Sequence, residues 1–85
     1  MSTVDLRNIL IKTLEDLGGS SKILPICRHA WTKYLSNQIS PKDDLFYTWQ
    51  YRIRWEARDL RKAKIMNSID DSPYGIWQLS SFKKK

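Results

Sequence analysis

The residue types that most often perform catalysis or bind metals are few in this chain and poorly placed for either task. The sequence contains one cysteine, Cys27, and one histidine, His29. Side chains two positions apart on a helix point to different faces, so these two cannot form a nucleophile–base dyad. The acidic pairs at 43–44 and 70–71 lie in expected turns beside prolines, with no accompanying base, and no Gly-rich phosphate loop is present. We therefore expect no enzyme activity, no metal and no cofactor.

Basic residues, in contrast, are concentrated in one segment. The chain of 85 residues carries 15 Lys and Arg against 9 Asp and Glu, a formal net charge of +6. The segment 47–64 alone holds six Lys and Arg against two acidic residues. Such a field attracts polyanions and speeds their encounter, which favours nucleic acid as a partner. The alternative is a basic surface that only keeps the protein soluble.

Length and composition predict one small intracellular domain. Eighty-five residues support a single domain, 1–82, followed by a basic tail, 83–85. One cysteine excludes an internal disulfide and fits a reducing compartment. No apolar run approaches the roughly 20 residues of a membrane span, and the N-terminus does not resemble a signal peptide. We expect a cytoplasmic protein without membrane contacts, nucleoid-associated if the source is bacterial.

Hydrophobic periodicity predicts three helices. Ser2 or Thr3 would cap the first, with Asp5 in its first turn, and the glycines at 18–19 would end it. A second helix is expected over roughly 23–35. The third begins near 46–48 and runs to about residue 64, with Asp43, Asp44 and Thr48 as its candidate caps.

Two short strands are expected after the helices. Residues 65–67 and 76–79 surround a polar, turn-rich loop, which predicts a β-hairpin. Ser20–Lys22 is too short to be more than an entry strand or a cap. The expected class is α+β: a winged helix-turn-helix with three helices followed by a C-terminal β-hairpin. In that arrangement the third helix enters the major groove of DNA, and the hairpin lies beside it.

The third helix has two different faces when it is projected at about 100° per residue. Ile53, Ala57 and Leu60 share the face expected to point into the core. Aromatic rings interleaved with Arg and Lys suit DNA, because guanidinium groups bind phosphates or guanine edges and rings pack on sugars, thymine methyls or exposed bases. The candidate DNA-binding residues on and beside the opposite face are Tyr51, Arg52, Arg54, Trp55, Arg58 and Lys62.

Structural roles for the same residues form the alternative. Trp55 could pack under the hairpin, against Ile76 or Trp77, and belong to the core. Arg61 and Lys62 could compensate the dipole at the C-terminal end of the helix. Arg58 could form only surface ion pairs with Glu56 or Asp59, which contribute little.

The segment Arg54–Ile65, followed by Ser72–Leu79, resembles the N-terminal winged-helix domain of Mrr-type restriction endonucleases. Those domains show an "RW-x-x-x-DL-x-KAG" helix end and an "SP-x-G-x-W-x-L" hairpin, and both motifs occur here at the expected separation. The resemblance extends from Gly18 to Leu79 and is strongest over the last third of the chain. It implies a module that recognises duplex DNA and that restriction systems usually tether to a nuclease domain. The carboxylates and lysine of such a nuclease are not in this chain.

Two departures from the family pattern bear on the site. Lys64 stands where the family has glycine, which puts the left-handed helix cap in doubt. The expected wing carries acid in the segment 68–71, which disfavours insertion of the wing into the minor groove. The expected partner is therefore double-stranded DNA bound mainly by the third helix, with a homodimer or a tethered or separate protein partner left open.

A protein-interaction module is the competing interpretation. Many winged helices bind other chains through an aromatic face or the wing. Tyr51, Trp55 and Tyr74 could form such a patch here.

Overall fold

The computed structural model describes residues 5–68 and 75–80, and its elements form a small α+β fold. Three α-helices, one π-helical segment and a two-stranded antiparallel sheet make up this fold, so the coarse class expected from the sequence is confirmed. In chain order the elements are α1 (Leu6–Asp16), β1 (Ser20–Lys22), α2 (Ile23–Ala30), η1 (Trp31–Leu35), α3 (Leu45–Lys62) and β2 (Ile76–Gln78).

Helix α1 is closed at both ends by local hydrogen bonds. The Asp5 carboxylate accepts a hydrogen bond from the Asn8 backbone N–H at 3.0 Å, which makes Asp5 the cap of the helix. The expectation of Asp5 in the first turn is therefore wrong, while Ser2 and Thr3 lie outside the described residues. At the other end Gly18 adopts φ +89°, and the Gly19 N–H donates to the Leu14 carbonyl at 2.7 Å. The glycines thus end the helix as expected, because this conformation favours a residue without Cβ.

The second helical segment covers the expected range but changes its winding. Helix α2 continues directly into η1, so that helical backbone extends from Ile23 to Leu35. The Ser36 N–H donates to the Trp31 carbonyl at 2.8 Å, the five-residue bond of a π-helix. Hydrophobic spacing predicts the helix but carries no signal for this wider turn.

The sheet joins two parts of the chain that lie far apart in sequence. Strand β1 pairs with β2 so that Ser21 lies opposite Trp77. Met66, on the other side of β2, forms only an isolated bridge with Leu79, supported by a 2.8 Å bond from the Asn67 N–H to the Gln78 carbonyl. The expected hairpin arms therefore meet, but β1 is the principal partner of β2. Ser20–Lys22 is a short strand leading into α2, one of the two roles expected for it, whereas its pairing with β2 was not predicted. The loop between the arms, residues 69–74, lies outside the described part.

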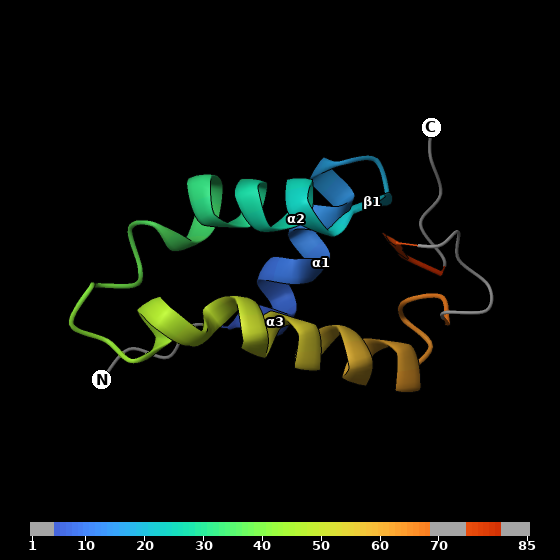
Figure 1. Cartoon of the computed structure of the whole chain (residues 1–85). Coiled ribbons are helices and arrows are strands. Elements are labelled where there is room, and N and C mark those ends of the chain that lie inside the picture. The colour runs from blue at the N-terminus through green and yellow to red at the C-terminus, as the bar shows by residue number, and fades with distance from the viewer. Residues whose placement is uncertain (1–4, 69–74, 81–85) are drawn as a thin grey trace.

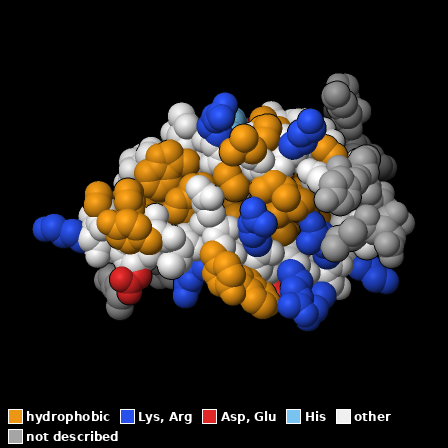
Figure 2. All heavy atoms as spheres, viewed as in Figure 1, with side chains coloured by type: hydrophobic (Ala, Val, Ile, Leu, Met, Phe, Trp, Pro, Cys, Tyr) orange, Lys and Arg blue, Asp and Glu red, His pale blue; other side chains and the backbone are white. Residues whose placement is uncertain are grey.

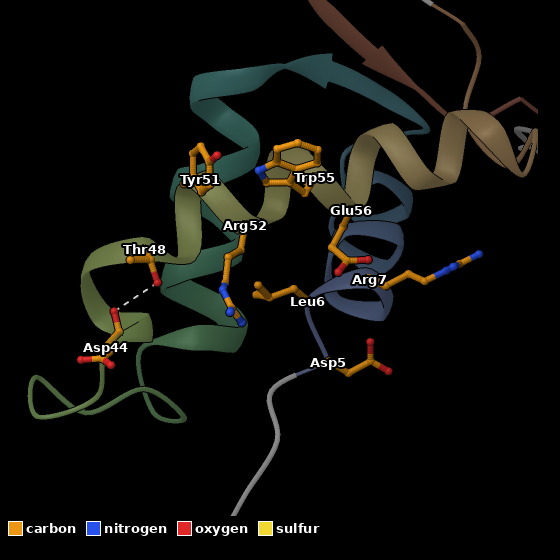
Figure 3. A pocket seen from close by; sticks show the side chains of 9 residues that line it. All are labelled: Asp5, Leu6, Arg7, Asp44, Thr48, Tyr51, Arg52, Trp55 and Glu56. Atoms are coloured by element: carbon orange, nitrogen blue, oxygen red, sulfur yellow. Dashed lines mark hydrogen bonds between the residues drawn. The ribbon is translucent and has the colours of Figure 1, made fainter.

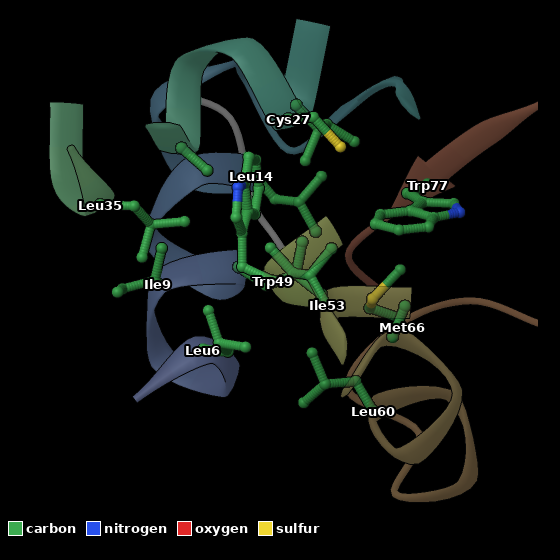
Figure 4. Packing of buried hydrophobic residues seen from close by; sticks show 14 of the residues in the cluster. Leu6, Ile9, Leu14, Cys27, Leu35, Trp49, Ile53, Leu60, Met66 and Trp77 are labelled. Atoms are coloured by element: carbon green, nitrogen blue, oxygen red, sulfur yellow. The ribbon is translucent and has the colours of Figure 1, made fainter. Parts of the chain in front are cut away.

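The core lies where α1 crosses α2 and α3 and contacts both (Figure 1). Leucine and isoleucine side chains from the three helices fill it, and Met66 and Trp77 close it on the side of the sheet (Figure 4). Trp31 and Trp49 stack with ring centroids 5.6 Å apart between η1 and α3. The largest fully buried hydrophobic side chains are Leu10, Leu14, Ile26, Leu35, Ile53, Leu60 and Met66. Within the residues described, no helix combines the length and apolar character needed to cross a membrane.

Candidate nucleic-acid interface

Helix α3 presents one face to the core and the other to solvent. Ile53, Ala57 and Leu60 are fully buried, as the sequence predicted, and Trp49 extends the same stripe towards the N-terminal end. The helix begins at Leu45 and ends at Lys62, close to the expected bounds. These four anchors fix the rotation of α3 about its axis. The side chains on the opposite side of the helix therefore point towards solvent.

The aromatic residues of the outer face are exposed. Tyr51 is 64% exposed and Trp55 47%. Trp55 does not pack under the strands, so that alternative is wrong. It contacts Tyr51 instead, with ring centroids 6.1 Å apart at 72°, and the Arg58 guanidinium lies 5.3 Å from its ring centroid. The face shows orange hydrophobic and blue basic side chains next to one another along α3 (Figure 2).

Four of the candidate residues line one small hollow. Tyr51, Arg54, Trp55 and Arg58 surround a solvent-open space of about 250 Å³ without any acidic side chain. We call this the aromatic notch. Its two rings and two guanidinium groups offer apolar faces and positive charge together, a combination that suits a base and its phosphate.

Arg52 lies on the other flank of α3, in a different electrostatic setting. It lines a larger hollow of about 910 Å³ between the start of α1 and α3 (Figure 3). Three acidic residues, Asp5, Asp44 and Glu56, line the same hollow and offset the charge of Arg52 and Arg7. Of the two flanks, the one with Arg54 and Arg58 is therefore better suited to a polyanion.

No acidic residue in the described part of the chain forms an ion pair with an arginine of the outer face. In residues 5–68 and 75–80, both ion pairs involve Asp16, and neither includes an α3 side chain. The interpretation of Arg58 as a partner of Glu56 or Asp59 is thus wrong, because its guanidinium stacks on Trp55 instead. Lys62 is exposed in the last turn of α3.

Arg61, in contrast, is part of the packing. Its guanidinium lies 5.9 Å from the Trp77 ring centroid, and burial lowers the pKa of the group. Its buried Nε has no hydrogen-bond partner among the described residues. Arg61 therefore supports β2 rather than the outer face of α3.

The end of α3 adopts the left-handed cap despite lacking the family's glycine. Lys64 has φ +63°, and the next N–H, that of Ile65, donates to the Leu60 carbonyl at 2.9 Å. The Ser80 hydroxyl donates to the Lys64 and Ile65 carbonyls from across the fold. This tertiary contact helps to hold a conformation that a lysine rarely adopts.

Cys27 and His29 have separate surroundings. Cys27 is buried, and desolvation raises the pKa of its thiol. His29 Nε2 lies 3.1 Å from the Asp16 carboxylate, which also accepts hydrogen bonds from Tyr34 and Lys33. These contacts, led by the one from Tyr34, lower the pKa of Asp16 to about 2. The group joins the end of α1 to α2 and η1, and in the described part of the chain no three Cys, His, Asp or Glu residues converge as metal ligands would.

One exposed aromatic residue was missed by the sequence analysis. Tyr47 is 77% exposed and lies one turn before Tyr51 on the same side of α3. Its spacing of four residues from Tyr51 could have indicated this position. It was not used because the predicted start of the helix, near 46–48, left Tyr47 at the boundary. Tyr74 and the acidic residues at 70–71 lie outside the described residues.

Comparison of the chain with protein-family models, with curated proteins and with solved structures finds no match, so the geometry of α3 carries the functional argument.

Proposed function

We propose that this protein is a duplex DNA-binding module, of a restriction-system or regulatory type, that places α3 in the major groove. The observation that carries the proposal is the outer face of α3. There Arg54 and Arg58 are exposed beside Tyr51 and Trp55, with no acidic side chain paired to either arginine in the described structure. Unpaired guanidinium groups keep their hydrogen-bonding capacity for phosphates or guanine edges.

The order of the elements supports a winged helix-turn-helix. β1 precedes α2, and the segment after α3 returns beside β2 through the Met66–Leu79 bridge. With α1 beneath them, α2 and α3 would form the helix pair and the strands the base of the wing. On this basis the resemblance to the Mrr-type N-terminal domain is retained as a proposal.

Salt-dependent binding tests the proposed function. Fluorescence anisotropy with a labelled duplex should show affinity falling by about a hundredfold between roughly 50 and 200 mM salt, if about four phosphates are contacted. Arg58→Ala should weaken binding and reduce the slope of log affinity against log salt by about one. Lys12→Ala is the matched control, because it removes one charge from the exposed side of α1, whose other side packs on the inner face of α3. Equal behaviour of the two variants would show that α3 is not the contact helix.

Protein interaction is the second candidate function. Leu24, Tyr47, Tyr51 and Trp55 are large hydrophobic residues left exposed. A groove of about 460 Å³ between α2 and α3 also includes Leu24 in its lining. A concentration-dependent increase in mass by sedimentation, together with no duplex binding at low salt, would favour this function over DNA binding.

A further inference from the structure

We infer that the aromatic notch receives an unstacked base, so that the protein prefers duplexes containing a bulged or mismatched base over fully paired ones. The inference rests on the proposed DNA binding and specifies the kind of DNA. It begins from the two exposed rings, Tyr51 and Trp55, which a purely electrostatic contact would not require.

The chemistry of a paired duplex matches the notch only in part. The floor of the major groove presents base edges, which are mainly polar donors and acceptors, and the thymine methyl is their chief apolar group. Rings held against such edges would desolvate polar atoms without supplying partners for them. The face of a base is the complementary surface for a ring, but in a paired duplex neighbouring bases cover it.

The size and charge of the notch fit one base with its phosphate. About 250 Å³ lies just below the range of roughly 300–1,000 Å³ that is typical of pockets for drug-sized ligands, and a single flat ring system is small enough for it. Tyr51 and Trp55 stand nearly perpendicular, at 72°, so they form a corner rather than a closed slot. Arg58 stacks on Trp55 from within the same hollow, and Arg54 lines it as well. A base against the rings would therefore bring its phosphate close to two guanidinium groups.

The energetic balance decides which DNA is preferred. Stacking on an aromatic side chain contributes about 1–3 kcal/mol per base, while extruding a paired base costs a few kcal/mol. These terms roughly cancel for a paired duplex. A bulged or mismatched base is already partly unstacked, so the stacking free energy is gained at little cost. A preference of about tenfold corresponds to about 1.4 kcal/mol of this gain.

Anisotropy titrations with three probes test the inference: a paired duplex, the same duplex with one unpaired adenine, and the single strand. We expect the wild-type protein to bind the bulged duplex about tenfold more tightly than either of the others. Trp55→Leu should abolish the preference, and Trp55→Phe, which keeps an aromatic face, should retain part of it. Tyr47→Leu is the control, because it removes an exposed ring outside the notch and should leave the tenfold ratio intact. A circular dichroism melt of each variant establishes that it is folded.

A fluorescent base adds a second readout, which reports stacking of the unpaired base directly and not the overall affinity. With 2-aminopurine at the bulge, binding of wild-type protein should quench its emission through stacking, whereas Trp55→Leu should not. Equal affinity for paired and bulged duplexes, both weakened by Arg58→Ala, would overturn this inference and leave the proposed function standing. Tightest binding to the single strand would also overturn it. Failure to bind any of the probes at low salt would overturn the proposed function itself.

Discussion

Each of two clusters in this molecule places a cationic side chain beside an aromatic ring, and only one of the two also contains a carboxylate. At the end of α1, Lys33 and Tyr34 lie together, with the Lys33 ammonium 5.5 Å from the ring centroid. On α3, Arg58 and Trp55 lie together at 5.3 Å. The first cluster surrounds a carboxylate, Asp16, whereas the second lines a notch without one.

On the function proposed above, similar side chains serve stability in one cluster and binding in the other. Around Asp16 the donors of Lys33, Tyr34 and His29 are used inside the protein, and they connect α1 to α2 and η1. On α3 the Arg54 and Arg58 guanidinium groups line the notch beside two rings, and no acidic side chain among the described residues forms an ion pair with either of them. Their strongest interaction is therefore left for a partner outside the chain, which we propose to be DNA.

The largest predicted effect separates the two clusters by their role in binding. Replacing both Arg54 and Arg58 by Ala should lower duplex affinity by at least about a hundredfold, since each charge-assisted hydrogen bond contributes about 1.5–3 kcal/mol and tenfold in affinity corresponds to about 1.4 kcal/mol. Lys33→Ala removes a cation from the Asp16 cluster and should change affinity by less than about twofold. Anisotropy at one fixed salt concentration measures both. An equal loss from Lys33→Ala would mean that the overall charge, and not the α3 face, determines binding.

At Asp16 we expect a substitution to lower the stability of the fold and to leave DNA affinity unchanged. Asp16→Asn should destabilise the fold by about 1 kcal/mol, a modest value because the carboxylate is solvent-exposed and screened. For a domain of this size that lowers the melting temperature by about 4–8 °C. Thermal unfolding by circular dichroism gives the shift. Glu15→Gln is the matched control: it removes a neighbouring exposed carboxylate that has no hydrogen bond or ion pair in the described structure, and it should leave the melting temperature nearly unchanged.

The pH dependence of stability follows from the same carboxylate. Its pKa in the folded protein, about 2, is below the ordinary value of 3.8, so the folded state binds fewer protons than the unfolded state in this range. The stabilisation is therefore complete above about pH 4 and is lost as the pH falls towards about 2. Denaturant melts of wild-type and Asp16→Asn protein should converge over this window. A constant difference between them down to pH 2 would show that Asp16 acts by packing and not by its charge.

The smallest predicted effect concerns Lys64 at the end of α3, where two variants distinguish the contribution of its charge to stability from that of its backbone conformation. Lys64→Gly should raise stability by about 0.5–1 kcal/mol, because glycine adopts the positive φ of this position without a Cβ penalty. Lys64→Ala is the control that removes the same charge and keeps the penalty. Thermal melts should place the glycine variant above both other proteins. If the two variants have equal melting temperatures, the left-handed conformation is not a source of strain.

The helices were predictable from sequence because their signals are local. Spacing of Leu and Ile located α1, and Ile53, Ala57 and Leu60 gave the rotation of α3. From that rotation followed the exposure of Tyr51. The exposure of Trp55 was harder to predict. It could lie on the open face of α3 or under the strands, and the choice depended on where the strands would lie.

The features missed from sequence depend on contacts between distant segments. β1 pairs with a strand more than fifty residues later, and no local pattern specifies that partner. The Asp16 cluster forms only because α1 and α2 pack together, bringing a carboxylate to donors 13 to 18 positions away. The left-handed Lys64 contradicts residue preference and is accompanied by hydrogen bonds from Ser80.

The most direct test of the comparison between the two clusters is a chemical-shift map of ¹⁵N-labelled protein titrated with duplex DNA at low salt. We predict that the perturbed signals belong to the outer face of α3, including the indole N–H of Trp55, while the amides around Asp16 and Lys33 remain in place. Perturbations centred on the Asp16 cluster, or none at all with saturating duplex, would contradict the assignment of α3 as the contact helix.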